Sequence, residues 1–270
     1  MIVSMEKLLN TTGVAEKNAQ TLNKSLRFLT YLLTSIRRFF MKMKRLFAKA
    51  PDYELARTIL GKDFISPEKI MNLCRSITYT SKQLAKFRKT IPLQEILEWC
   101  RDNSCMLVAG PNRPMSLFDI CAIKKNCFYS GTGRWYFNQK FFQEDKVETR
   151  WYIICKSSAP ESIYKNWEEQ EVLISNIETV PNAAEFTWAI IAYKAVRGVY
   201  LFSEISVRTL SLDLYGNHIS IGKFSSKGLL ITNNWNTECS PFLGLSVARR
   251  QRSKTMLDHL IAYHLRTWSF

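Results

Sequence analysis

The side chains best suited to chemistry in this sequence are seven cysteines and three histidines. A zinc site needs three or four such ligands converging, usually at short spacings. No Cys-x-x-Cys occurs, and the loose pairs Cys100/Cys105 and Cys121/Cys127 have no histidine nearby. We therefore expect no metal and read the cysteines as buried free thiols in a reducing, cytoplasmic compartment. The cysteines are Cys74, Cys100, Cys105, Cys121, Cys127, Cys155 and Cys239.

Motifs for catalysis or nucleotide binding are equally sparse. Gly131-Thr132-Gly133 is the only Gly-x-Gly, and it lacks the third glycine of a dinucleotide loop. His259 and His264 lie five apart on an expected helix, so they point to different faces. No nucleophile elbow supports a Ser/His/Asp triad, although a triad can assemble from distant positions. The sequence favours a binding protein without a cofactor over an enzyme, and an enzyme with a dispersed site is the alternative.

Residues suited to adaptable recognition are concentrated between Thr209 and Arg250. Tyrosine and tryptophan supply contact area at low entropic cost, while asparagine and serine supply flexible hydrogen bonds. An ordinary system of polar loops with Asn/Gly turns is the alternative explanation. We expect the following side chains to be shown to a ligand: Tyr215, Asn217, His218, Lys223, Ser225, Thr232, Asn233, Asn234, Trp235, Asn236 and Glu238.

Positive charge is concentrated at the two ends of the chain. The formal net charge is +15, of which residues 1–50 carry +8 and residues 241–270 carry +4. Basic ends of this kind can meet nucleic acid, an anionic membrane or an acidic partner. Solvated tails are the alternative. Arg134-Trp135-Tyr136 and Arg150-Trp151-Tyr152 could stack on single strands, but core strands explain them better.

Apolar residues at three- and four-residue steps predict a basic amphipathic helix over residues 15–48. Such a helix could lie on a membrane surface, pack on a partner or pack on its own domain. Arg27, Arg37 and Arg38 interrupt its most apolar part, so we expect no transmembrane span. A start at the downstream Met41 would remove the helix.

The compact part begins with helices and continues with strands. Residues 52–60, 66–75 and 92–103 read as helices, and residues 81–84 open a short turn. Further helices are expected at 161–177, at 181–194 with Asn182 near the N-cap, and at the end over 253–268. Strands are expected at 105–109, 134–136, 150–155, 199–202, 206–210, 218–221, 229–231 and 243–247. The alternation of His218-Ile219-Ser220-Ile221 is typical of a half-buried strand.

Three segments carry a resemblance to a known fold. Gly244-Leu245-Ser246-Val247-Ala248-Arg249 resembles the Gly-Phe-Arg-x-Ala-Arg ending of the C-type-lectin-like fold of formylglycine-generating enzymes and of the variable proteins of diversity-generating retroelements. The helix from Val180 to Trp188 is similar to the Pro-x-x-x-Glu-Trp helix of that fold. Val207-Arg208-Thr209-Leu210-Ser211 is placed like its Leu-Arg-Gly-Gly-Ser strand, with Thr209-Leu210 replacing the two glycines.

The resemblance implies a lectin-like scaffold that shows diversified residues to a ligand. Residues 51–250 also look like an uncharacterised family from small-genome bacteria and metagenomes. The paired cysteines of the formylglycine-generating enzymes have no counterpart here, where Cys239 stands alone, so their oxidative chemistry is not expected.

Together these observations predict an α+β protein, with a helical N-terminal part before a C-type-lectin-like domain of short twisted strands and two helices. The expected divisions are a basic helical extension (1–50), a helical subdomain (51–104), an α+β domain (105–250) and a C-terminal helix (251–270). The expected partner is an unknown protein or surface ligand. Nucleic acid or an anionic membrane, bound through residues 15–48, is the alternative.

Overall fold

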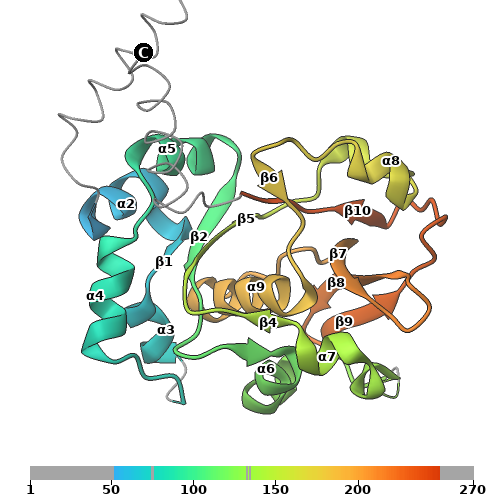
Figure 1. The fold of residues 1–270 in the computed structure, drawn as a ribbon, viewed down its shortest axis with the longest axis horizontal. Helices are drawn as coiled ribbons and strands as arrows, with labels where there is room; N and C mark the ends of the chain where they lie inside the picture. The colour runs from blue at the N-terminus through green and yellow to red at the C-terminus, as the bar shows by residue number, and fades with distance from the viewer. Residues whose placement is uncertain (1–51, 74–75, 132, 134, 250–270) are drawn as a thin grey trace, which may run out of the picture. The chain divides into compact units, whose positions relative to one another are not determined.

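A computed structural model describes residues 52–73, 76–131, 133 and 135–249. These residues form an α+β fold, with helices early in the chain and more strands toward its end (Figure 1). The helices expected at 15–48 and 253–268 lie outside the described residues. The compact unit that contains all described residues begins at Pro51.

The N-terminal helices start and stop where local signals predict. Helix α2 (Tyr53–Leu60) is capped by the side chain of Asp52 and ends at Gly61, whose φ of 53° suits a glycine. Helix α3 (Pro67–Leu73) follows Ser66, and α5 covers Gln94–Asp102. The turn expected at residues 81–84 opens a full helix, α4 (Ser81–Lys89), because Thr80 and Gln83 form a capping box.

A five-stranded sheet lies beside these helices, in the order β1-β2-β5-β11-β6. Its strands are β1 (Phe64–Ile65), β2 (Cys105–Ala109), β5 (Trp151–Cys155), β11 (Ala248–Arg249) and β6 (Glu178–Thr179). Strands β2 and β5 are antiparallel and almost wholly buried. One face packs on the N-terminal helices, where the Trp151 ring meets Tyr53 of α2 and Phe87 of α4.

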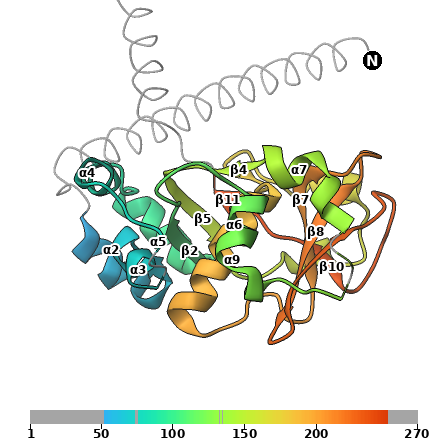
Figure 2. The same cartoon turned by 90° about the horizontal axis from the view of Figure 1, so that it is seen from below.

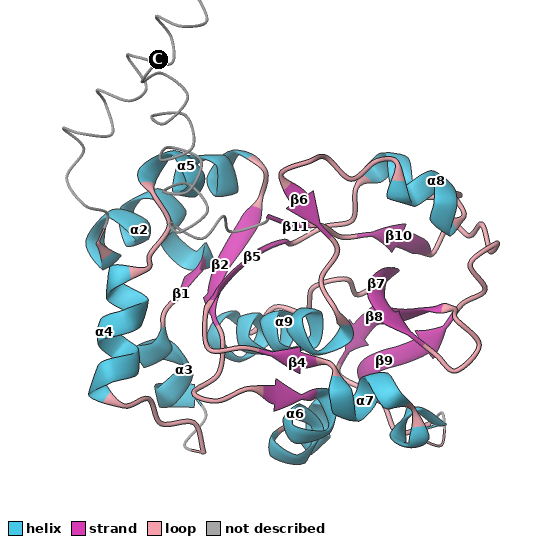
Figure 3. Ribbon diagram, viewed as in Figure 1, coloured by secondary structure: helices cyan, strands magenta, loops and turns pink. Residues whose placement is uncertain are grey.

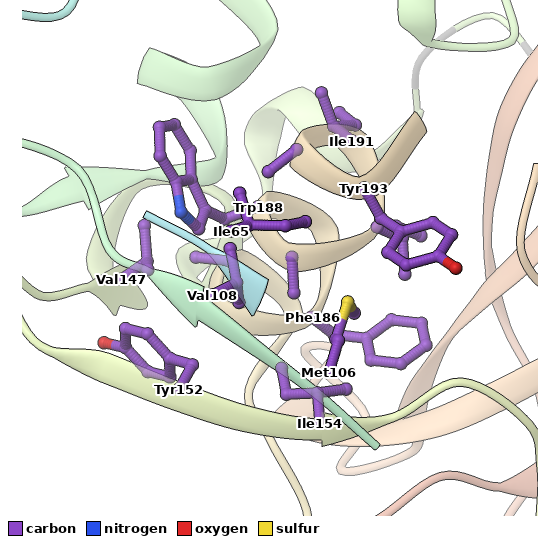
Figure 4. Packing of buried hydrophobic residues seen from close by; sticks show 14 of the residues in the cluster. Ile65, Met106, Val108, Val147, Tyr152, Ile154, Phe186, Trp188, Ile191 and Tyr193 are labelled. Carbon is purple, nitrogen blue, oxygen red and sulfur yellow. The ribbon is translucent and has the colours of Figure 1, made fainter. Parts of the chain in front are cut away.

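The opposite face of this sheet packs on α9 (Ala183–Arg197), as Figure 4 shows for Met106, Val108 and Ile154 beside Phe186 and Trp188. This helix begins with a capping box between Asn182 and Glu185 and ends at Gly198 in the left-handed conformation. It is buried nearly all round, because sheets and helices enclose it. Figure 2 shows α9 between the N-terminal helices and the C-terminal strands.

A four-stranded sheet is built from strands in the C-terminal third of the described chain, in the order β10-β7-β8-β9. Strands β7 (Ser206–Leu212), β8 (His218–Ser225) and β9 (Gly228–Asn233) form an antiparallel meander. Strand β10 (Leu243–Leu245) pairs with β7 in parallel, so the chain between β9 and β10 must cross from one end of the sheet to the other (Figure 3).

Several shorter elements complete the fold. Strand β3 (Met115–Ser116) pairs with β4 (Lys146–Val147). Around them lie α6 (Leu117–Ile123) and α7 (Lys140–Glu144), and α8 (Trp167–Glu171) lies toward the four-stranded sheet (Figure 1). The 3-10 turns are η1 (Gly61–Asp63), η2 (Lys125–Cys127), η3 (Trp135–Asn138) and η4 (Pro160–Ser162).

Four expectations about elements are wrong. Residues 135–138 form a 3-10 turn and not a strand, because Tyr136 packs into an aromatic cluster with Phe137 and Phe142. Residues 199–202 form a turn after α9. The helix expected at 161–177 is only the five residues of α8, flanked by loops. The strand at His218 is fully buried over its first five residues and not half-buried.

The larger of two hydrophobic clusters runs from Ala56 in α2 to Ala248 in β11, and the smaller one joins Trp167, Val180 and Leu245. Strand β1, from the expected helical subdomain, pairs with β2 of the expected α+β domain. The expected boundary at residues 104/105 therefore does not divide the core. Among the described residues, none of the helices is both long and apolar enough to cross a membrane.

Candidate functional site

The turn between β7 and β8 is organised by the carboxylate of Asp213. Its Oδ1 accepts the backbone N–H groups of Tyr215 and Asn217, both at 2.8 Å. Its Oδ2 accepts the side-chain amide of Asn233, at 3.1 Å from β9. Burial alone would raise the pKa of Asp213, but these hydrogen bonds to the charged form outweigh it, and the pKa lies below its usual range. Gly216, at φ 81°, supplies the left-handed residue that the turn needs.

Asn236 ties the loop after β9 to this turn. Its Oδ1 accepts the N–H of His218 at 3.0 Å, and its Nδ2 donates to the carbonyl of Gly216 at 3.0 Å. Its own N–H donates to Oδ1 of Asn217, and its carbonyl accepts the N–H of Trp167 at 2.8 Å. One amide residue thus fixes three segments of chain against one another.

Arg208 of β7 holds the loop after β9 by hydrogen bonds to its backbone. Its side chain is fully buried in β7, and its guanidinium donates to the carbonyls of Trp235 (3.1 Å) and Glu238 (2.8 Å). It also donates to Oε1 of Gln170 (2.9 Å) and to the carbonyl of Lys165 (3.2 Å). Burial lowers the pKa of Arg208, and the nearby Glu238 opposes this. A buried cation with four acceptors fixes the loop after β9 to the segment before α8.

His218 is a packing residue within this frame. Its ring stacks on Trp167 with centroids 3.6 Å apart, and its Nδ1 lies 2.7 Å from the carbonyl of Thr209. A carbonyl oxygen only accepts, so Nδ1 carries the proton. Burial lowers the pKa of His218, which keeps the ring neutral at pH 7.

Two aromatic side chains project from the tied loops into solvent. Tyr215 is 85% exposed and Trp235 is 70% exposed, although their neighbours Asn217 and Asn236 are held by hydrogen bonds. Leu214 is exposed beside Tyr215. We call Leu214, Tyr215, Asn233, Asn234 and Trp235 the aromatic loop surface.

Among protein-family models, curated proteins and solved structures, none matches this chain. What the aromatic loop surface could do is therefore argued from its own contacts.

The structure divides the eleven residues expected to face a ligand. Tyr215, Lys223, Asn233 and Trp235 are exposed, while Ser225, Thr232, Asn234, Asn236 and Glu238 are partly exposed. Asn217 and His218 are buried and belong to the frame, which corrects the expectation that both are displayed. Most of the partly exposed side chains are engaged locally: Thr232 bonds Asn234, and Asn234 bonds Glu238 at 2.8 Å.

Lys223 and Ser225 lie apart from the rest. Pairing of Ser206 with Gly222 and of Leu212 with His218 puts them at the opposite end of β8 from Tyr215. Lys223 follows His218 by five positions along β8, or roughly 16 Å. There the Lys223 ammonium lies 5.3 Å from the ring of exposed Phe242, which forms a second, smaller patch.

Sequence reasoning missed the residues that hold the surface, namely Asp213, Arg208, Trp167 and Gln170. Arg208 carried a usable signal, because an arginine between Val207 and Thr209 in a buried strand requires several hydrogen-bond acceptors. No group of three or more His, Cys, Asp or Glu residues in the described ranges is arranged to hold a metal ion.

Proposed function

We propose that this chain is a binding protein whose recognition surface is the aromatic loop surface around Tyr215 and Trp235. One observation carries the proposal. Asn236 and Asp213 join the β7–β8 turn to the loop after β9, and Arg208 holds that loop from β7, yet the turn and the loop each present a large exposed aromatic side chain.

The energetics of association favour such an arrangement. Ordering loops and side chains on binding opposes affinity, and hydrogen bonds already made in the free protein remove part of that cost. Tyrosine and tryptophan dominate binding energy at interfaces because they bury a large area with few rotatable bonds. A loop with internally bonded polar groups can therefore offer Tyr215 and Trp235 as rigid anchors.

The titratable groups under the surface support binding over catalysis. The carboxylate of Asp213 is occupied by hydrogen bonds from Tyr215, Asn217 and Asn233, and the ring of His218 is covered by Trp167. A general acid or base must reach a substrate proton, and these two groups are directed into the fold.

Ligand binding by the full-length protein tests the proposal. A panel of purified candidate glycans and surface proteins is screened by surface plasmon resonance against the wild type. Any ligand found is then titrated with Tyr215→Ala and Trp235→Ala. We expect each substitution to weaken binding at least tenfold, a loss typical of an aromatic anchor. Leu93→Ala, an exposed apolar residue before α5, is the matched control and keeps full affinity. Unchanged affinity in both loop variants would refute the proposal.

From the resemblance to retroelement variable proteins we make a narrower proposal. The displayed residues vary between related proteins, while the residues that hold the loops, such as Asp213 and Arg208, do not. Coding sequences from related isolates test it. Substitutions should gather at Tyr215, Asn233 and Trp235, spare Asp213 and Arg208, and accompany a near-repeat of the coding segment. Even scatter across residues 51–250 without such a repeat would rule out this version and leave the binding proposal standing.

A further inference from the structure

Cys105 and Cys155 face each other directly across β2 and β5. Backbone hydrogen bonds between β2 and β5 show whether Cys105 and Cys155 form a hydrogen-bonded or a non-hydrogen-bonded pair. The N–H of Lys156 donates to Ser104, and the N–H of Gly110 donates to Arg150, so these two pairs are the hydrogen-bonded ones. Alternation along an antiparallel ladder then makes Cys105/Cys155 a non-hydrogen-bonded pair.

The backbone of Cys155 agrees with this assignment, because its N–H points away from β2 and donates to Val247 at 3.0 Å. Non-hydrogen-bonded pairs have Cα atoms about 4.5 Å apart with their side chains close together on one face, which lies within the range of a disulfide.

A third thiol lies beside the pair. Cys100 lies in α5, which packs on β2. Cys100 and Cys105 are buried, and burial raises the pKa of the Cys100 thiol to about 12. Cys155 is only partly buried. Of the three, Cys155 is therefore the thiol that a small oxidant can reach.

We propose that Cys105 and Cys155 are a redox-modified pair, which a hydroperoxide converts to a disulfide bridging β2 and β5. The thiolate of Cys155 attacks one oxygen of hydrogen peroxide and leaves hydroxide and a sulfenic acid. The sulfur of Cys105 then displaces the sulfenic oxygen as water. Two thiols and one peroxide give one disulfide and two waters. A dithiol reductant reverses the change.

The bridge would lock a junction between the two larger sheets. Cys155 bonds the chain between β10 and β11 twice, through its N–H to Val247 and through its carbonyl, which accepts the hydroxyl of Ser246. Strand β10 belongs to the sheet that carries the aromatic loop surface. Since Cys105 and Cys155 are already in register, oxidation requires neither strand to slip along the other, and the oxidised protein should unfold at a higher temperature.

Peptide mapping of the full-length protein tests the proposal. The native protein is treated with a small excess of hydrogen peroxide, catalase removes the peroxide, and the chain is unfolded in N-ethylmaleimide and digested. We expect a linked peptide pair containing Cys105 and Cys155. We also expect a rise in melting temperature of roughly 10 °C that dithiothreitol abolishes.

Two serine variants provide the comparison. Cys155→Ser should lose both the linked peptides and the rise in melting temperature, while Cys239→Ser, at an exposed cysteine, should keep both. The wild-type map needs no variant to fold. Full alkylation of Cys105 and Cys155 under conditions that oxidise Cys239 would overturn the proposal. So would a bridge that joins Cys155 only to Cys100 or to a second chain.

Discussion

At the scale of single residues, the polar side chains between β7 and β10 have two separate roles. Asp213, Asn217, His218 and Asn236 form the frame, while Tyr215 and Trp235 are displayed. Composition reveals that such residues are concentrated here, but it does not separate the roles, because asparagine suits both. Which asparagine joins the frame and which is displayed depends on the backbone N–H and C=O groups that the fold leaves without partners. Those groups can be identified only once the register of the sheet is known.

The buried ring of His218 makes stability depend on pH. Its pKa is lowered in the folded protein, so the unfolded chain takes up the proton first as pH falls. This contribution is complete above the unfolded value near 6.5 and is lost as pH falls toward the folded pKa. We expect the free energy of unfolding to drop between pH 7 and pH 5, by at most about 2 kcal/mol, the limit that the unfolded pKa alone sets.

Urea titrations at several pH values measure this effect. Asp213 also destabilises the protein as pH falls, because its pKa is lowered in the folded state, but only below its unfolded pKa near 4. The pH range in which Asp213 acts therefore lies below that of His218. His218→Gln should be less stable at pH 7 and should lose the pH dependence between 7 and 5. A variant that keeps the wild-type slope in that range would show that other groups cause it.

At the scale of elements, local signals located most of the helices and strands. Capping residues placed α2, α3 and α9 correctly, since a cap needs only neighbours in sequence. The elements that were predicted wrongly are those whose structure depends on packing against residues remote in sequence. The aromatic residues of η3 look like strand residues but are held by Phe142 from α7, and His218 and Ser220 are buried because other elements cover both faces of β8.

The loop between β9 and β10 depends on an element remote in sequence, because Arg208 of β7 supplies its hydrogen bonds. Arg208→Ala leaves the carbonyl of Glu238 and Oε1 of Gln170 without their donor. It also removes one of the two donors to the carbonyl of Trp235, which keeps the N–H of Glu238. We expect a loss of about 2–4 kcal/mol in the free energy of unfolding. Backbone amide exchange should also accelerate in residues 234–241 before it does so in β8.

Arg101→Ala is the matched control for this prediction. Arg101 forms an exposed ion pair with Asp102 on α5, and its removal should change stability by less than about 0.5 kcal/mol. Equal stability of the two variants would mean that water replaces Arg208 without penalty. The loop would then not be a preformed surface.

At the scale of the whole molecule, charge and candidate surface lie in different parts of the chain. Residues 1–50 carry a net charge of +8, whereas the aromatic loop surface belongs to the compact unit that starts at Pro51. The two hypotheses drawn from the sequence, recognition by a loop surface and contact with nucleic acid through residues 15–48, therefore concern separable segments.

Deleting residues 1–50 separates these hypotheses. We expect the full chain to bind a single-stranded oligonucleotide with an affinity that falls steeply with added salt, because bound cations release counterions. Each lost phosphate contact should reduce the slope of log K against log salt by about 0.7, so the shortened chain should lose most of the slope. Titrations of fluorescent oligo(dT) between low and physiological salt measure both the affinity and the slope.

The shortened chain should keep its melting temperature, since the described core runs from Ala56 to Ala248. If it keeps its oligonucleotide affinity as well, nucleic-acid contact belongs to the compact unit, and Tyr215 and Trp235 become the first residues to test for base stacking.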